Sequence, residues 1–175
     1  MTMEVHDAIR TRRSVRSYDP RPVPDDVLAR ILEAGRIAPS ANNRQPWKFI
    51  VVKDQANREK LTDGRWAKFL KDCPVVIAGC GDTTASPEWC VVDTTIALEN
   101  MVLAATAEGV GTCWIGSFYE DKVKSALKVP DGHKVVAMLA VGYPKDKDEL
   151  SPAKPRKHNR KAPEEIFYSE EFGRR

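Results

Sequence analysis

The sequence has few aromatic residues, no paired-cysteine motif and little net charge. Aromatic side chains make up 7% of the 175 residues, and the formal net charge is only +3. So small an excess argues against a protein whose whole surface binds nucleic acid. Four cysteines stand at positions 73, 80, 90 and 113, without CxxC spacing. We expect buried, reduced thiols, and the sequence leaves a metal site or a redox disulfide open as alternatives.

A hydrophobic run long enough to cross a bilayer without interruption is also missing. The longest apolar segment, residues 89–107, contains Asp93, Glu99 and Asn100, which a bilayer core tolerates poorly. The first residues lack the basic-then-apolar pattern of a secretory signal. We therefore expect a cytoplasmic protein with no membrane partner. With 42% apolar and 30% charged residues, the chain is expected to form one globular domain over residues 1–175.

Periodicity and breaker residues predict alternating helices and strands. Helices are expected over 4–11, from 25 until Pro39, over 55–62, 87–108 and 119–127, with a helical piece near 66–71, and strands over 47–52, 74–80, 112–115 and 135–141. Ser86 and Pro87 suit the start of the helix over 87–108, and Gly109 suits its end. That helix is apolar on nearly every face, so it must be buried on all sides. A second subunit is a natural way to cover the face that one domain leaves open.

Two compact sets of cations and one amide-rich loop indicate a ligand site. Residues 12–16 read Arg-Arg-Ser-Val-Arg, and residues 154–157 read Lys-Pro-Arg-Lys. Between them, residues 39–47 read Pro-Ser-Ala-Asn-Asn-Arg-Gln-Pro-Trp. Arginine offers a planar fork of donors that suits a phosphate, and lysine offers a point charge. The segments predict a site for an anionic ligand, against the simpler interpretations of a solvated helix end and a basic tail.

These motifs, in this order, resemble the short form of the FMN-dependent nitroreductases. The resemblance continues with Asp-x-x-x-Ala-x-x-Asn-Met-x-Leu-Ala-Ala at 93–105, Gly-x-Gly-Thr-Cys-Trp-Ile-Gly at 109–116 and Glu-Glu-Ile-x-x-Tyr at 164–168. It implies an α+β sandwich with a mostly antiparallel central sheet flanked by helices. It also implies a homodimer with two FMN molecules at the interface. Residues 152–175 would form a domain-swapped C-terminal arm on the partner subunit.

The resemblance further implies which residues hold FMN. The phosphate would be held by Arg12, Lys154 and Arg156. Arg13 and Ser14 would hold the phosphate and the ribityl chain. A second set would surround the flavin ring: Pro39, Ser40 and Asn43 from the partner subunit, and the backbone of Ile115 and Gly116 near N5 and O4. Trp66 and Phe69 are candidates for the walls of the substrate side.

Arg16 is the residue on which turnover is expected to depend. The resemblance places it at the N1–C2=O edge of the flavin, where its positive charge would favour the reduced, anionic form. The implied activity is reduction of nitroaromatics, quinones or related small acceptors, with NADH or NADPH as hydride donor. Reductive dehalogenation or ene reduction, and a flavin carrier without turnover, stay open as alternatives. Nucleic-acid binding through residues 154–161 is disfavoured, because that basic run lacks interleaved aromatic residues.

Overall fold

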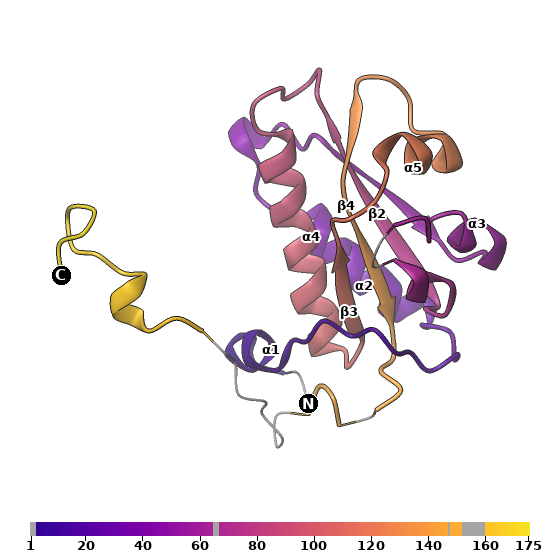
Figure 1. Cartoon of the computed structure of the whole chain (residues 1–175), viewed down its shortest axis with the longest axis horizontal. Coiled ribbons are helices and arrows are strands. Elements are labelled where there is room, and N and C mark those ends of the chain that lie inside the picture. The colour runs from indigo at the N-terminus through magenta and orange to yellow at the C-terminus, as the bar shows by residue number, and fades with distance from the viewer. Residues whose placement is uncertain (1–2, 65–66, 147, 152–159) are drawn as a thin grey trace.

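A four-stranded antiparallel sheet lies at the centre of the computed structural model, which describes residues 3–64, 67–146, 148–151 and 160–175 (Figure 1). The strands are β1 (Trp47–Val52), β2 (Val75–Asp82), β3 (Gly111–Ile115) and β4 (His133–Gly142). Their spatial order is β1-β2-β4-β3, so β2 and β4 occupy the middle. The apolar run of β2 is buried at every position but the last, as its sequence predicts for a central strand.

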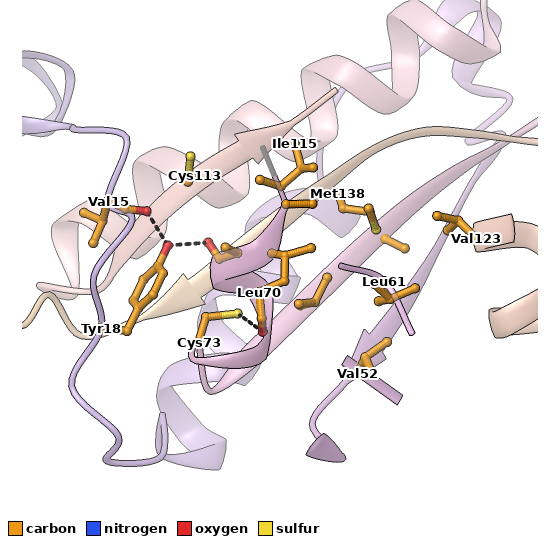
Figure 2. Close-up of a cluster of buried hydrophobic side chains, with 14 of the residues drawn as sticks. Val15, Tyr18, Val52, Leu61, Leu70, Cys73, Cys113, Ile115, Val123 and Met138 are labelled. Carbon is orange, nitrogen blue, oxygen red and sulfur yellow. Dashed lines mark hydrogen bonds between the residues drawn. The ribbon is translucent and has the colours of Figure 1, made fainter. Parts of the chain in front are cut away.

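Helices cover both faces of this sheet. On one face, α2 (Asp25–Arg36) and α4 (Cys90–Ala107) pack over Val75 and Ile77. On the other, Val76 and Ala78 join a cluster with side chains from α5 (Glu120–Leu127) and from the segment that links α3 (Gln55–Glu59) to β2 (Figure 2). The alternation follows the two-residue period of a strand. The predicted α+β sandwich is therefore confirmed.

Most predicted elements are present, with shorter boundaries in several places. The first helix, α1 (Val5–Thr11), and α2 begin and end within about two residues of the expectation. The helix expected over 55–62 ends at Glu59, and the piece expected near 66–71 is a 3-10 turn over Lys68–Lys71. Gly109 follows α4 with φ of +70°, the left-handed conformation that favours glycine after a helix.

The start of α4 differs from the sequence expectation. The helix begins at Cys90 rather than at 87, because residues 83–89 form turns that precede it. Asp82 accepts hydrogen bonds from the backbone N–H groups of Thr84 and Ala85, which fixes the first turn. The backbone carbonyl of Ser86 then accepts from Cys90 N at 2.9 Å. Ser86 thus supplies a backbone oxygen rather than the expected side-chain cap.

One face of α4 is uncovered in a single chain. Val91, Val92 and Ile96 are 40%, 46% and 37% exposed, whereas Leu98 and Met101 on the opposite face are fully buried. A single chain therefore leaves open one face of this apolar helix, and its expected burial by a second subunit stays a prediction. By length and composition alone α4 could cross a membrane, but half of it is buried within the protein, as in core helices of soluble proteins.

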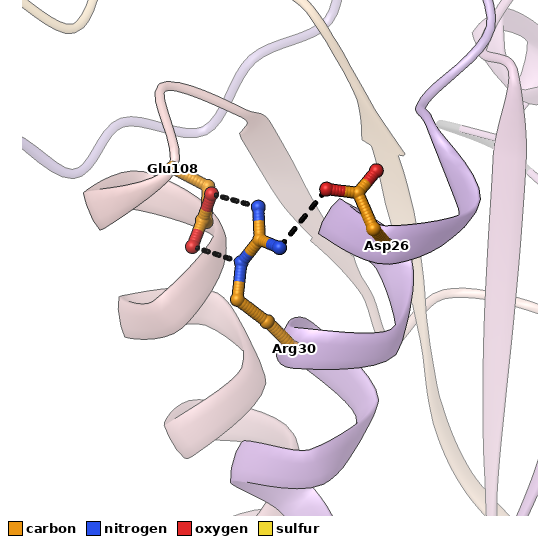
Figure 3. Close-up of polar contacts among 3 residues, drawn as sticks. All are labelled: Asp26, Arg30 and Glu108. Atoms are coloured by element: carbon orange, nitrogen blue, oxygen red, sulfur yellow. Dashed lines mark hydrogen bonds and ion pairs between the residues drawn. The ribbon is translucent and has the colours of Figure 1, made fainter.

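Two features fix α2 against α4. Gly35 lies so close to Met101 that an added Cβ would stand 2.1 Å from the methionine Cε, so any other residue would require the Met101 side chain to move. At the solvent edge, the Arg30 guanidinium binds both carboxylate oxygens of Glu108, at 2.7 and 2.9 Å, and Asp26 at 3.0 Å (Figure 3). These hydrogen bonds raise the pKa of Arg30 above its usual range and lower the pKa of both carboxyls.

The end of the chain extends away from the sheet. Residues 160–175 are exposed throughout and contain only a 3-10 turn over Pro163–Glu165 (Figure 1). Their apolar side chains have no covering: Phe167 is 70% exposed and Phe172 95%. Lys154 and Arg156 lie outside the described residues.

Candidate functional site

The arginine segment, residues 12–16, is held on the edge of the sheet. After α1 ends, Ser14 pairs with Thr112 of β3 as an isolated parallel bridge. Val15 N donates to Thr112 O at 2.9 Å, and the Val15 side chain is fully buried. In an extended chain neighbouring side chains alternate in direction. Burial of Val15 therefore leaves Ser14 and Arg16 on the solvent side, where both are exposed.

Gly111 makes this docking possible. A Cβ at Gly111 would lie 2.6 Å from Val15 Cγ2, closer than side chains pack, so any other residue would push the arginine segment away from β3. The glycine of the Gly-Thr-Cys-Trp-Ile motif is therefore required by a close backbone approach. The sequence carried this signal in the motif itself, although the partner of the glycine could not be read from it.

The cations of this segment have different environments. Burial raises the pKa of the Cys113 thiol on β3, and the positive charges of Arg16 and Arg12 act in the opposite direction. Arg16 Nη1 donates to Ser14 O at 3.3 Å. Arg13 turns back to α1, where its Nη1 donates to Arg10 O at 2.8 Å and to Arg12 O at 2.9 Å. The structure thus groups Arg12 and Arg16, while the Arg13 guanidinium caps the end of the helix.

The other end of β3 offers an open face. Ile115 is buried and pairs with Met138, and Gly116 follows it as an exposed residue. A Cβ at Gly116 would meet nothing within 4 Å. The backbone of Gly116 is therefore open on the side where a side chain would stand. Ser14 thus pairs with Thr112 near the start of β3, and Ile115 and Gly116 stand at the end of the same strand.

The amide-rich loop is built separately. Residues 41–43 form a 3-10 turn, and Asn42, Asn43 and Gln45 all have positive φ, near +50°. Ser40 Oγ accepts from Gln45 N at 2.9 Å. Residues other than glycine rarely adopt these backbone angles. The loop therefore needs contacts from the rest of the protein to hold it in this conformation.

Asp93 supplies one anchor of this loop. It is 3% exposed, and its Oδ1 accepts from Ala41 N at 3.1 Å. Its Oδ2 is buried and has no hydrogen-bond partner among the described residues. Asn100 likewise bonds to the backbone, through Nδ2 to Ala34 O at 3.3 Å. Both polar residues of α4 therefore bind backbone groups of neighbouring segments.

Within one chain this loop does not meet the arginine segment. Asp93 and the loop lie at the first turn of α4, whereas Thr112 and Ser14 lie beyond its last turn, at the opposite end of the helix (Figure 1). Pro39, Ser40 and Asn43 therefore stand apart from Arg12 and Arg16. The separation agrees with their expected contribution to a second copy of the site.

Two further expectations concern aromatic and sulfur groups. Phe69 is half-buried and stacks on Tyr18 at 6.3 Å between ring centroids, so one side of its ring belongs to the core. Trp66 lies outside the described residues. All four cysteines are buried and free, and burial raises the pKa of Cys73 to about 12 and of Cys80 to about 11. In the described part of the chain, no group of His, Cys, Asp and Glu could hold a metal ion.

Comparisons with known proteins bear on the family and the fold of the chain. A sequence model of the nitroreductase family matches residues 9–66 and 62–143. A protein of Archaeoglobus fulgidus, provisionally named an NADH dehydrogenase/NAD(P)H nitroreductase, is 35% identical over 150 residues, with 81% of this chain and 86% of its own covered.

Solved structures show the same fold. A nitroreductase family protein from Clostridium novyi is 31% identical, with a TM-score of 0.78 and 98% and 96% of the two chains covered. An FMN-dependent nitroreductase from Clostridium difficile is 25% identical, with a TM-score of 0.83 and coverage of 95% and 99%. The chain therefore belongs to the nitroreductase family.

Proposed function

We propose that this protein is an FMN-dependent NAD(P)H oxidoreductase that reduces nitroaromatics, quinones or related small acceptors. The observation that carries the proposal is the docking of the arginine segment on β3, which sets Arg16 on the same strand edge as the open backbone of Gly116. The family membership and the FMN-dependent structural relative support it. When bound, FMN would supply hydride exchange between the nicotinamide and the acceptor.

The residues on β3 fit a planar anionic cofactor. A flat ring can approach Gly116, because no atom occupies the space that a Cβ would take. Arg12 would hold the phosphate, with Ser14 next to it and Lys154 and Arg156 joining from the C-terminal segment. Arg13, whose guanidinium bonds to backbone carbonyls, would contribute through its main chain.

Arg16 would act through charge rather than by proton transfer. A guanidinium keeps its proton at every physiological pH, so it cannot serve as a general acid or base. Placed at the edge of the ring, it would stabilise negative charge that develops there, in a site that is already organised. The backbone of Ile115 and Gly116 would orient the ring without adding a competing titratable group.

We further propose that the enzyme is a homodimer that completes each flavin site with the loop of the partner. Three observations support this: the uncovered face of α4, the exposed apolar side chains of residues 160–175, and the distance of Ser40 and Asn43 from Arg16 along α4. Such an apolar surface is rarely left open in a soluble protein. Burying it would contribute ~25 cal/mol per Å² of apolar area.

Anaerobic spectroscopy of the purified protein tests the proposed reaction. The protein should bind one FMN per chain, lose flavin absorbance on addition of NADPH or NADH, and regain it when a quinone or nitroaromatic is added. A protein that binds no flavin would contradict the proposal. Flavin that neither nicotinamide reduces would instead indicate a carrier without turnover.

A further inference from the structure

We propose that an open cavity next to Arg16 binds a phosphate monoester, which in the proposed reaction is the 2′-phosphate of NADPH. The cavity has a volume of about 530 Å³. Its charged and aromatic lining residues are Arg16, Tyr18, Arg58, Lys71, Asp72 and Lys145. They come from several segments of the described chain.

The charge of this cavity is strongly unbalanced. Four cations line it, and Asp72 is the single carboxylate among the lining residues. In the part of the chain that the structure describes, no carboxylate oxygen lies within 4.0 Å of the charged nitrogens of Arg58, Lys71 or Lys145. A neighbouring hollow beside α5 is different, because Lys122 there pairs with Asp63. Unpaired cations that converge on a cavity attract an anion.

The cations converge because separate segments place them. Arg58 comes from α3, Lys71 from the 3-10 turn before β2, and Lys145 from the chain just after β4. Arg58 Nη1 donates to the Lys53 carbonyl, and this hydrogen bond orients the Arg58 guanidinium. Lys145 N donates to Ser17 O at 3.0 Å, which joins that segment to the arginine segment. The backbone positions are therefore fixed before any ligand binds.

No second anion forms in the wall of the cavity. Burial raises the pKa of the Tyr18 hydroxyl well above its usual range, so it stays protonated. Its hydrogen is donated to Val15 O at 2.7 Å. The ligand therefore meets cations and neutral donors, including Gln55 and Ser17, with Asp72 as the one opposing charge.

A phosphate monoester matches this lining better than other common anions. It carries a charge of about −1.5 to −2 at neutral pH and three acceptor oxygens. Arginine and lysine are the usual partners of such a group. The phosphate monoester of FMN is assigned by the resemblance to Arg12, Lys154 and Arg156. Of the two nicotinamides, NADPH carries one phosphate monoester and NADH carries none. Resting on the proposed function, in which Arg16 also lies at the flavin edge, the cavity predicts a preference for NADPH.

Titration calorimetry tests the site without turnover. Adenosine 2′-monophosphate, inorganic phosphate and adenosine are titrated into the FMN-loaded protein and into a Lys71→Ala/Lys145→Ala variant. Lys134→Ala is the matched control, because this exposed lysine lies at the opposite end of β4. We expect adenosine 2′-monophosphate to bind, adenosine not to bind, and the double variant to raise the Kd roughly tenfold. The control should leave the Kd unchanged, and salt should weaken binding.

Steady-state kinetics then tests the source of the phosphate. The ratio of kcat/KM for NADPH to that for NADH should fall roughly tenfold in the double variant and stay constant in Lys134→Ala. An unchanged Kd for adenosine 2′-monophosphate in the double variant would overturn the site. Equal losses for NADPH and NADH, or binding of inorganic phosphate alone, would overturn the assignment to NADPH. If the protein oxidises neither nicotinamide, the proposed function fails, and the calorimetric result still decides the phosphate site.

Discussion

The buried carboxylate of Asp93 accepts a hydrogen bond from the backbone N–H of Ala41 at 3.1 Å, which joins the first turn of α4 to the amide-rich loop. Asp93 is the one charged residue of that helix turn, and it is 3% exposed. Burying a charged group is costly unless it is paired or hydrogen-bonded. The hydrogen bond of Asp93 holds a loop in which three residues have positive φ, a backbone conformation that is unfavourable on its own.

Replacing Asp93 should therefore loosen the loop. Asp93→Ala removes the acceptor for Ala41 N and should lower the free energy of unfolding by about 1–3 kcal/mol. Asp93→Asn keeps an acceptor oxygen and should lose less. Urea unfolding at one fixed protein concentration measures both. Equal stability of the wild type and both variants would show that the hydrogen bond does not hold the loop.

Substitutions of two glycines in the same motif should differ in their effect on stability. Gly111→Ala would place a Cβ 2.6 Å from Val15 Cγ2, so it should destabilise the fold by about 1–3 kcal/mol and weaken FMN binding with it. Gly116→Ala meets no atom within 4 Å and should leave the unfolding midpoint unchanged. Because its methyl group enters the proposed ring space, FMN affinity should still fall. A Gly116→Ala protein with full flavin affinity would place the ring elsewhere.

The sequence predicted local elements well and their junctions less well. Signals between residues close in sequence were sufficient for two elements. The apolar run predicted the buried strand β2, and the helix predicted from residue 25 is α2, with Asp25 and Asp26 in its first turn. The predicted start of α4 was wrong. Asp82 accepts hydrogen bonds from the N–H groups of Thr84 and Ala85, so the chain forms turns before the helix begins. The Ser-Pro pattern alone does not reveal that competition.

The candidate site shows the same division. The cations of residues 12–16 predicted an anion site, and the family resemblance added Ile115 and Gly116. The Ser14–Thr112 bridge brings residues 12–16 and the strand that carries Ile115 together. The cavity formed with Arg58, Lys71 and Lys145 could not be predicted, because these residues come from three segments far apart in the sequence. Such convergence depends on the sheet order, which no single motif contains.

The uncovered face of α4 should control assembly. Ile96→Glu places a charge on a side chain that is 37% exposed in one chain and that we expect to be buried in the dimer. Analytical ultracentrifugation should show a dimer for the wild type. For the variant it should show a monomer that binds less FMN. Lys134→Glu, on an exposed residue of β4, is the matched control and should stay dimeric. A wild-type protein that is a stable, flavin-bound monomer would contradict the proposed dimer.

The buried thiols should be unreactive in the folded protein. Thiolate is the reactive form, and burial raises the pKa of Cys73 to about 12 and of Cys80 to about 11. Alkylation at pH 8, followed by peptide mass spectrometry, should label neither before urea is added and both afterwards. The native pKa values lie above the ordinary value of 9.0, so unfolded thiols ionise first. The free energy of unfolding should thus fall as pH rises above 9.0, and rapid native labelling of Cys73 would contradict its burial.

In the proposed site, Arg16 faces the edge of the flavin that gains charge on reduction. Redox titration of the bound flavin in wild type, Arg16→Lys and Arg16→Ala tests it most directly. Arg16→Ala should lower the midpoint potential by on the order of 30 mV or more, since ~30 mV corresponds to ~1.4 kcal/mol for a two-electron couple. Arg16→Lys should fall between the two, because it keeps the charge but loses the planar fork. A midpoint in Arg16→Ala within a few millivolts of wild type, with FMN still bound, would contradict the account.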